Sequence, residues 1–141
     1  MPELSYRIGG LIINKDALEN KVYACESGHR YVVKGEDDTV SIYVAELIRP
    51  KIIKLKEFKL DEKTIVSGGS LHLDKGILVM DDYSQQGTTP KRAAKEFAGQ
   101  IMLELQSMGI EVTDIFVNPT RPFPGMVKVH PYWEGVGLDF E

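Results

Sequence analysis

The chain has 141 residues, of which 43% are hydrophobic, 27% are charged and 9% are aromatic. This length and composition exclude a disordered protein and predict a single domain over residues 1–141 that folds around one core. The net charge of −4 and the isoelectric point of about 5.4 argue against a surface that binds nucleic acid or acidic membranes over its whole area.

The sequence shows no segment with the features of a signal peptide or a membrane span. Apolar runs such as residues 11–13 and 77–80 fall far short of the ~20 residues that cross a bilayer. Cys25 is the only cysteine, so no internal disulfide can form, which is typical of a reducing compartment. We therefore predict a cytoplasmic protein.

The first two-thirds of the chain is predicted to form short strands separated by turns. Residues 5–13 have the pattern of a strand with a bulge at Gly9-Gly10, and residues 39–48 that of a long strand with alternating apolar residues. Residues 51–60 fit no clear period and are assigned to a strand. The other predicted strands are 22–26 and 30–34, joined by a hairpin loop, 64–66 and 71–73, joined by a turn at 67–70, and 77–81, which follows a tight turn at 74–76.

One long helix is predicted over residues 90–108. Thr89 is expected at the N-cap, Pro90 at the first helical position and Gly109 as the left-handed terminator. Between them, apolar residues recur at steps of three and four and form one stripe, which must pack on a sheet. Further strands are predicted at 111–117 and 126–130. The expected fold is α+β, with a mostly antiparallel sheet of short strands and one long amphipathic helix packed on it.

The segment between the strand at 77–81 and the helix has the composition of an anion site. Two acids end the strand, and a loop rich in glycine and hydroxyl groups enters the helix N-terminus, whose unpaired N–H groups and dipole attract anions. One hypothesis is therefore a site for a phosphorylated small molecule, with Mg²⁺ as its only cofactor. Its residues would be Asp81, Asp82, Ser84, Gly87, Thr88, Thr89 and Arg121. The alternative is ordinary turn and capping chemistry without a ligand.

This segment resembles the ribose-phosphate loop of type I phosphoribosyltransferases, in which four apolar residues, two acids and a loop precede Gly-Thr-Thr and a helix. The resemblance implies that Asp81 and Asp82 bind ribose hydroxyls and that residues 85–89 wrap a 5′-phosphate. It covers about 13 of the 141 residues. The sequence departs from the family at residues 83–86, at Pro90, and in the hairpins that replace alternating strands and helices upstream.

The three histidines and the cysteine carry no recognisable metal or nucleophile pattern. His72 and His130 alternate with apolar neighbours and are predicted on the polar faces of their strands, while His29 is predicted in a hairpin loop. Their spacing matches no metal-ligand motif. We therefore expect three surface histidines, no metal site, and Cys25 as a small buried apolar residue.

Residues 49–59 contain five basic residues and one acid. A basic segment with a nearby aromatic is one way to bind nucleic acid. In an acidic protein, the alternative is an edge strand whose lysines prevent aggregation.

The loop at residues 118–125 contains three prolines and carries Arg121 and Phe123. A stiff loop that presents these residue types is typical of a contact surface, which Tyr132 and Trp133 would extend. The alternative is that Phe123 and Trp133 cover the open end of the sheet. If the strands at 77–81 and 112–117 are parallel neighbours, Asp81, Asp82 and Arg121 converge at one edge.

No short-range pairing of a base with a nucleophile is visible in the sequence, so catalytic residues are not assigned and an enzymatic role stays open. Our leading hypothesis is a non-catalytic interaction or structural module that acts as a homo-oligomer. The alternatives are an enzyme or sensor that binds a phosphorylated molecule at residues 81–89, and nucleic-acid binding through residues 49–59.

Overall fold

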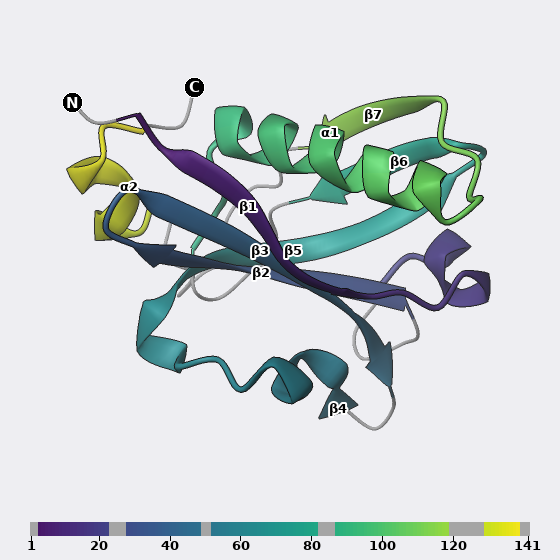
Figure 1. The fold of residues 1–141 in the computed structure, drawn as a ribbon, viewed down its shortest axis with the longest axis horizontal. Helices are drawn as coiled ribbons and strands as arrows, with labels where there is room; N and C mark the ends of the chain where they lie inside the picture. Colours follow the sequence, from purple (N-terminus) through teal and green to yellow (C-terminus); the bar gives the residue numbers. More distant parts are fainter. Residues whose placement is uncertain (1–2, 23–27, 49–51, 82–86, 119–128, 139–141) are drawn as a thin grey trace.

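A computed structural model describes residues 3–22, 28–48, 52–81, 87–118 and 129–138. They form an α+β fold in which one long helix, α1 (Lys91–Ser107), lies across one face of a mixed β-sheet (Figure 1). The strands are β1 (Ser5–Ile12), β2 (Gly28–Glu36), β3 (Thr39–Ile48), β4 (Ile52–Ile53), β5 (Ile65–Asp74), β6 (Ile77–Asp81) and β7 (Asp114–Asn118). The short helical segments are η1 (Asp16–Glu19), η2 (Lys54–Phe58), η3 (Glu62–Thr64) and α2 (Pro131–Gly135).

The sheet is mixed, which corrects the prediction of a mostly antiparallel sheet. Its strand order is β1-β3-β2-β5-β6-β7, with β4 paired to the last residues of β3. The pairs β1–β3 and β6–β7 are parallel and form the two ends of the sheet, while the strands between them pair antiparallel. Both parallel pairs need a crossover connection, and α1 is the crossover between β6 and β7. Residues 77–81 and 114–118 are thus parallel neighbours, which is the condition under which Asp81, Asp82 and Arg121 were expected to converge.

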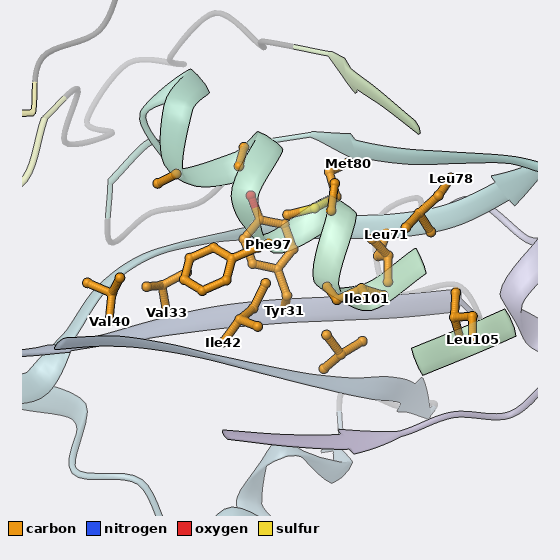
Figure 2. Close-up of a cluster of buried hydrophobic side chains, with 14 of the residues drawn as sticks. Tyr31, Val33, Val40, Ile42, Leu71, Leu78, Met80, Phe97, Ile101 and Leu105 are labelled. Atoms are coloured by element: carbon orange, nitrogen blue, oxygen red, sulfur yellow. The ribbon is translucent and has the colours of Figure 1, made fainter. Parts of the chain in front are cut away.

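The main core lies between α1 and the sheet. Figure 2 shows Phe97 and Ile101 of α1 pointing toward Tyr31, Val33 and Leu71 of the sheet. The helix can approach closely because its buried face also carries three alanines, and each fully buried large side chain contributes about 1.5–3 kcal/mol. The predicted amphipathic stripe is therefore the face that builds the core.

Several local predictions are confirmed. The pairing of β1 with β3 shifts at the predicted Gly9-Gly10 bulge, and the long strand at residues 39–48 is β3. The turn before β6 is present, with positive φ at both Lys75 and Gly76. Helix α1 ends before Gly109, whose φ of +82° is the expected left-handed conformation.

Other local predictions are wrong. Residues 67–70 form no turn but continue β5, and residues 54–58 are the 3₁₀ helix η2 instead of a strand. The N-cap of α1 is Pro90, not Thr89. The predicted strands at 22–26 and 126–130 fall mostly outside the described residues.

Gly69 of β5 leaves room for the aromatic ring that lies against it. A Cβ atom at Gly69 would lie 2.8 Å from the Tyr31 ring and closer still to the Asp81 carbonyl oxygen. A glycine in a strand is expected where another group approaches the backbone this closely. The same arrangement recurs at Gly9, which faces the Tyr43 ring, and at Gly35, which faces the Tyr132 ring.

The two faces of the sheet are covered differently. In Figure 1, α1 lies above the sheet, and β4 with η2 lies below it. Below the sheet, Phe58 of η2 packs on Tyr43 of β3 with ring centroids 5.1 Å apart. We call the side away from α1 the open face; its part on β5, β6 and β7 carries the candidate site. No helix among the described residues is both long and apolar enough to cross a membrane.

Candidate functional site

A row of polar and aromatic side chains crosses three strands on the open face. Leu71 and Leu73 of β5 point into the core, so the alternate residues Ser70 and His72 point the other way. Ser70 pairs with Asp81 and His72 with Val79 of β6, and Val79 pairs in turn with Phe116 of β7. Side chains of directly paired residues share a face of the sheet, so β5, β6 and β7 together build one surface.

A cleft with a volume of about 290 Å³ opens on this row. Chain preceding β2 supplies its second wall. The lining residues are Lys21, Val22, Ser70, His72, Asp74, Val79, Asp81 and Phe116. The volume is at the lower end of the range for small-molecule pockets.

Asp81 is held in place from both sides of the sheet. On the open face, its Oδ1 accepts from the Ser70 backbone N–H at 3.2 Å and its Oδ2 accepts from Ser70 Oγ at 2.6 Å. On the helix face, its carbonyl oxygen accepts from the Tyr31 hydroxyl at 2.8 Å. The carboxylate therefore has a fixed orientation at the cleft.

His72 is the unusual residue of the cleft. The residue is only 4% exposed, and neither Nδ1 nor Nε2 has a hydrogen-bond partner among the described residues. Burial lowers the pKa of His72 and the Lys21 charge lowers it further, while Asp81 and Asp74 oppose the shift. The ring is thus neutral near pH 7, with one donor and one acceptor. A buried polar atom without a partner costs about 1–3 kcal/mol, so this cost requires an explanation.

The structure does not bring the predicted phosphate residues together around the Asp81 carboxylate. Thr88 and Thr89 are each 2% exposed, and Thr89 Oγ1 lies 3.1 Å from the Tyr31 hydroxyl, on the helix side of the sheet. Gly87 is buried as well and has a φ of +141°. Because the Asp81 carboxylate faces the opposite side, it does not lie beside the Thr89 hydroxyl. The predicted residues Asp82, Ser84 and Arg121 lie outside the described residues.

The aromatic residues of the C-terminal segment close the sheet instead of forming an exposed contact surface. Trp133 is fully buried, and Tyr132 is half-buried, with its hydroxyl donating to the Asp37 carbonyl oxygen at 2.8 Å. Their rings meet edge to face at 5.6 Å. The prediction of Trp133 as an exposed contact residue is thus wrong, because α2 turns its indole into the core. Phe123 lies outside the described residues.

The prediction of three surface histidines is wrong for His29 and His72, which are buried. His29 lies in β2, not in a loop, and is fully buried on the helix face, where its Nε2 accepts from the Asn14 backbone N–H at 3.1 Å. His130 is half-buried and caps α2 through its Nδ1, which accepts from the Tyr132 N–H at 3.0 Å. The alternation that placed His72 on the side opposite to Leu71 was correct. What it missed was that the chain before β2 covers that side.

Only part of the basic segment at residues 49–59 lies among the described residues. Residues 49–51 and Cys25 lie outside the described residues, and Lys56 and Lys59 are exposed. Within the described part of the chain, no group of three or more His, Cys, Asp or Glu side chains is placed to hold a metal ion.

No protein-family model matches the chain, and neither the curated proteins nor the solved structures contain a significant match. The function is therefore argued from the geometry of the cleft.

Proposed function

We propose that this protein is a binding domain for a small hydrogen-bonding molecule, which it takes up in the cleft between β5, β6 and β7. The observation that carries the proposal is His72, a neutral imidazole in the wall of the cleft that is buried without a partner for either ring nitrogen in the part of the chain that the structure describes. Buried polar groups are almost always hydrogen-bonded. A ligand that accepts from one nitrogen and donates to the other would satisfy both.

The surroundings of His72 define the ligand class. Two carboxylates, Asp74 and Asp81, and one lysine, Lys21, are the charged residues in the described lining of the cleft, and this excess of negative charge favours a molecule with N–H or O–H donors over an anion. Val79 and the 54%-exposed ring of Phe116 offer a flat apolar surface beside these charged residues, on which a planar ring can stack. The combination fits a neutral or cationic amino-heterocycle of one or two rings better than a phosphorylated compound.

The same geometry favours binding over catalysis. Ser70 Oγ donates its proton to Asp81 at 2.6 Å and is therefore not hydrogen-bonded to His72. A serine nucleophile needs a base that takes its proton, and His72 does not occupy that position. The role as a non-catalytic module, expected from the sequence, stays a prediction that this arrangement supports.

Ligand titration followed by NMR tests the proposal. The probes are adenine, cytosine and 2-aminopyridine, compared with inorganic phosphate in the presence and absence of Mg²⁺. We expect the heterocycles to shift the resonances of His72 and Phe116, and to raise the free energy of unfolding by about 2.7 kcal/mol at a hundred times the dissociation constant.

Matched carboxylate variants identify the site. Asp81→Asn should weaken heterocycle binding by about tenfold or more, since it replaces an acceptor by a donor. Asp114→Asn removes an exposed carboxylate from the neighbouring strand, outside the cleft, and should leave binding unchanged. If no heterocycle binds, the proposal is overturned. If phosphate with Mg²⁺ instead shifts residues 87–90, the phosphate-loop hypothesis takes its place.

A further inference from the structure

The two edge strands of the sheet differ in how they are protected from pairing with another chain. Among the described residues, β1 pairs only with β3 and β7 only with β6. The β1 edge carries the bulge at Gly9-Gly10 and the charge of Arg7, which are features that discourage edge pairing. In β7 the sequence Asp-Ile-Phe-Val-Asn contains no lysine, no proline and no bulge.

The β7 edge also carries exposed apolar side chains. Only four large hydrophobic residues are exposed in the described part of the chain. Two of them, Phe116 at 54% and Ile77 at 38%, lie on the open face of β7 and its neighbour β6. The other two, Leu103 and Met108, lie outside the sheet, in α1 and the residue that follows it, and are not part of this edge. Exposed apolar surface beside an unprotected strand edge marks a protein–protein contact.

We propose that two copies of this chain pair antiparallel through β7, around a two-fold axis at Phe116. The charge pattern of the strand permits pairing with a second copy and favours the antiparallel direction. Asp114 is the only charged residue of β7, and the antiparallel register places it opposite position 118 of the second copy, which is an asparagine. A parallel pairing would place Asp114 beside its own copy, and like charges directly opposite are destabilising.

This register sets Phe116 against Phe116 of the second copy on the open face. Cross-strand aromatic pairs are among the more favourable pairs in antiparallel sheets. Because Phe116 also lines the cleft, the second copy would extend the aromatic wall of each binding site. The dimer does not require a ligand, and its test measures the mass of the ligand-free protein. The dimer can therefore be disproved while ligand binding is confirmed, and ligand binding can be disproved while the dimer is confirmed.

Analytical ultracentrifugation of the ligand-free protein over about a hundredfold concentration range tests the pairing. We expect a dimer whose dissociation constant rises by about tenfold or more in Phe116→Lys, since a lysine at the centre of an edge discourages pairing. Leu103→Lys is the control: it adds the same charge at an exposed position of α1 and should leave the dimer unchanged. A protein that remains monomeric at all concentrations overturns the proposal.

Cysteine crosslinking fixes the register and does not depend on the stability of the lysine variants. Directly opposite residues of an antiparallel pair have Cα atoms about 4.5–5.5 Å apart, which suits a disulfide. In a Cys25→Ser background, Phe116→Cys should form a disulfide-linked dimer under mild oxidation, whereas Asp114→Cys should form one only together with Asn118→Cys. Rapid crosslinking of Asp114→Cys alone would show a parallel pairing and contradict the proposed dimer.

Discussion

The protein buries one histidine on each face of its sheet, and the two differ in how many of their ring nitrogens are hydrogen-bonded. His29, on the helix face, accepts a hydrogen bond from the Asn14 backbone N–H at Nε2, has no partner among the described residues at Nδ1, and lies against the segment that contains η1. His72, on the open face, has no partner for either nitrogen and lines a cleft. Burial alone therefore does not separate a structural histidine from one available for binding. The difference lies in which hydrogen bonds are already made.

Among the predicted effects, lowering the pH should cause the largest change in the free energy of unfolding. Burial lowers the pKa of His29 to about 4 from its usual 6.5, with the Ala17 backbone opposing the shift. The unfolded chain therefore takes up the proton first as the pH falls. The stabilisation is complete above pH 6.5 and is lost between pH 6.5 and 4, by about 3 kcal/mol at 1.36 kcal/mol per pH unit.

Urea unfolding at a series of pH values measures this loss. Carboxylates contribute to acid unfolding as well, so the informative quantity is the difference between the parent and His29→Leu. The variant should show a distinctly shallower decline over this window. Equal slopes in both proteins would mean that His29 titrates normally in the fold.

The second prediction concerns the free energy of unfolding when each of the two histidines, His29 and His72, is replaced by leucine. His29→Leu should lower the free energy of unfolding at pH 7 by about 2 kcal/mol, because the Asn14 N–H loses its acceptor at a partly buried position. Chemical denaturation at pH 7 gives the value. An unchanged or raised stability would remove the structural role assigned to His29.

At His72 the sign should reverse. His72→Leu removes two buried nitrogens that have no partner, so the ligand-free protein should gain about 1 kcal/mol while binding of the heterocycle probes is lost. A gain in stability together with a loss of binding is expected of a site that is kept for function. If His72→Leu destabilises the free protein instead, the imidazole has a structural role and the comparison with His29 fails.

The smallest predicted effect concerns the hydrogen bond that Ser70 Oγ donates to the Asp81 carboxylate. Ser70→Ala removes the 2.6 Å hydrogen bond to Oδ2 but keeps the backbone N–H bond to Oδ1, so we expect a loss of about 0.5–1.5 kcal/mol. The carboxylate should become less ordered, which would weaken heterocycle binding more than stability. Comparison of the unfolding free energy with the dissociation constant measures both. A loss of stability with unchanged affinity would show that Ser70 does not orient the acid.

The sequence was sufficient where local patterns determine the structure. The apolar spacing over residues 90–108, with Gly109 after it, predicted α1, and the strand pattern at 39–48 predicted β3. Prediction from the sequence failed where the residue type at a position is determined by contact with a residue that is distant in the sequence. The glycines at 68–69 have the composition of a turn, yet they lie within β5, and Gly69 makes room for the Tyr31 ring.

The candidate site was only partly predictable for the same reason. Asp81 was identified at the end of its strand, but its grouping with Thr89 overlooked that the Thr89 hydroxyl and the Asp81 carboxylate lie on different faces of the sheet. His72 was placed on the correct face by alternation. Its burial could not be predicted, because it depends on the chain near Lys21 and Val22 coming over β5, which no local pattern specifies.

The aromatic rings that lie over strand glycines limit how this sequence can change during evolution. At Gly9 and Gly35 the obstacle to a side chain is the ring of Tyr43 or Tyr132, so a larger residue there becomes acceptable once the ring is exchanged for a smaller group. At Gly69 the Asp81 carbonyl oxygen blocks the position too, and no second substitution removes a backbone atom. Diverged forms of this protein should therefore vary at the first two glycines in concert with their tyrosines, and should keep residue 69 unchanged.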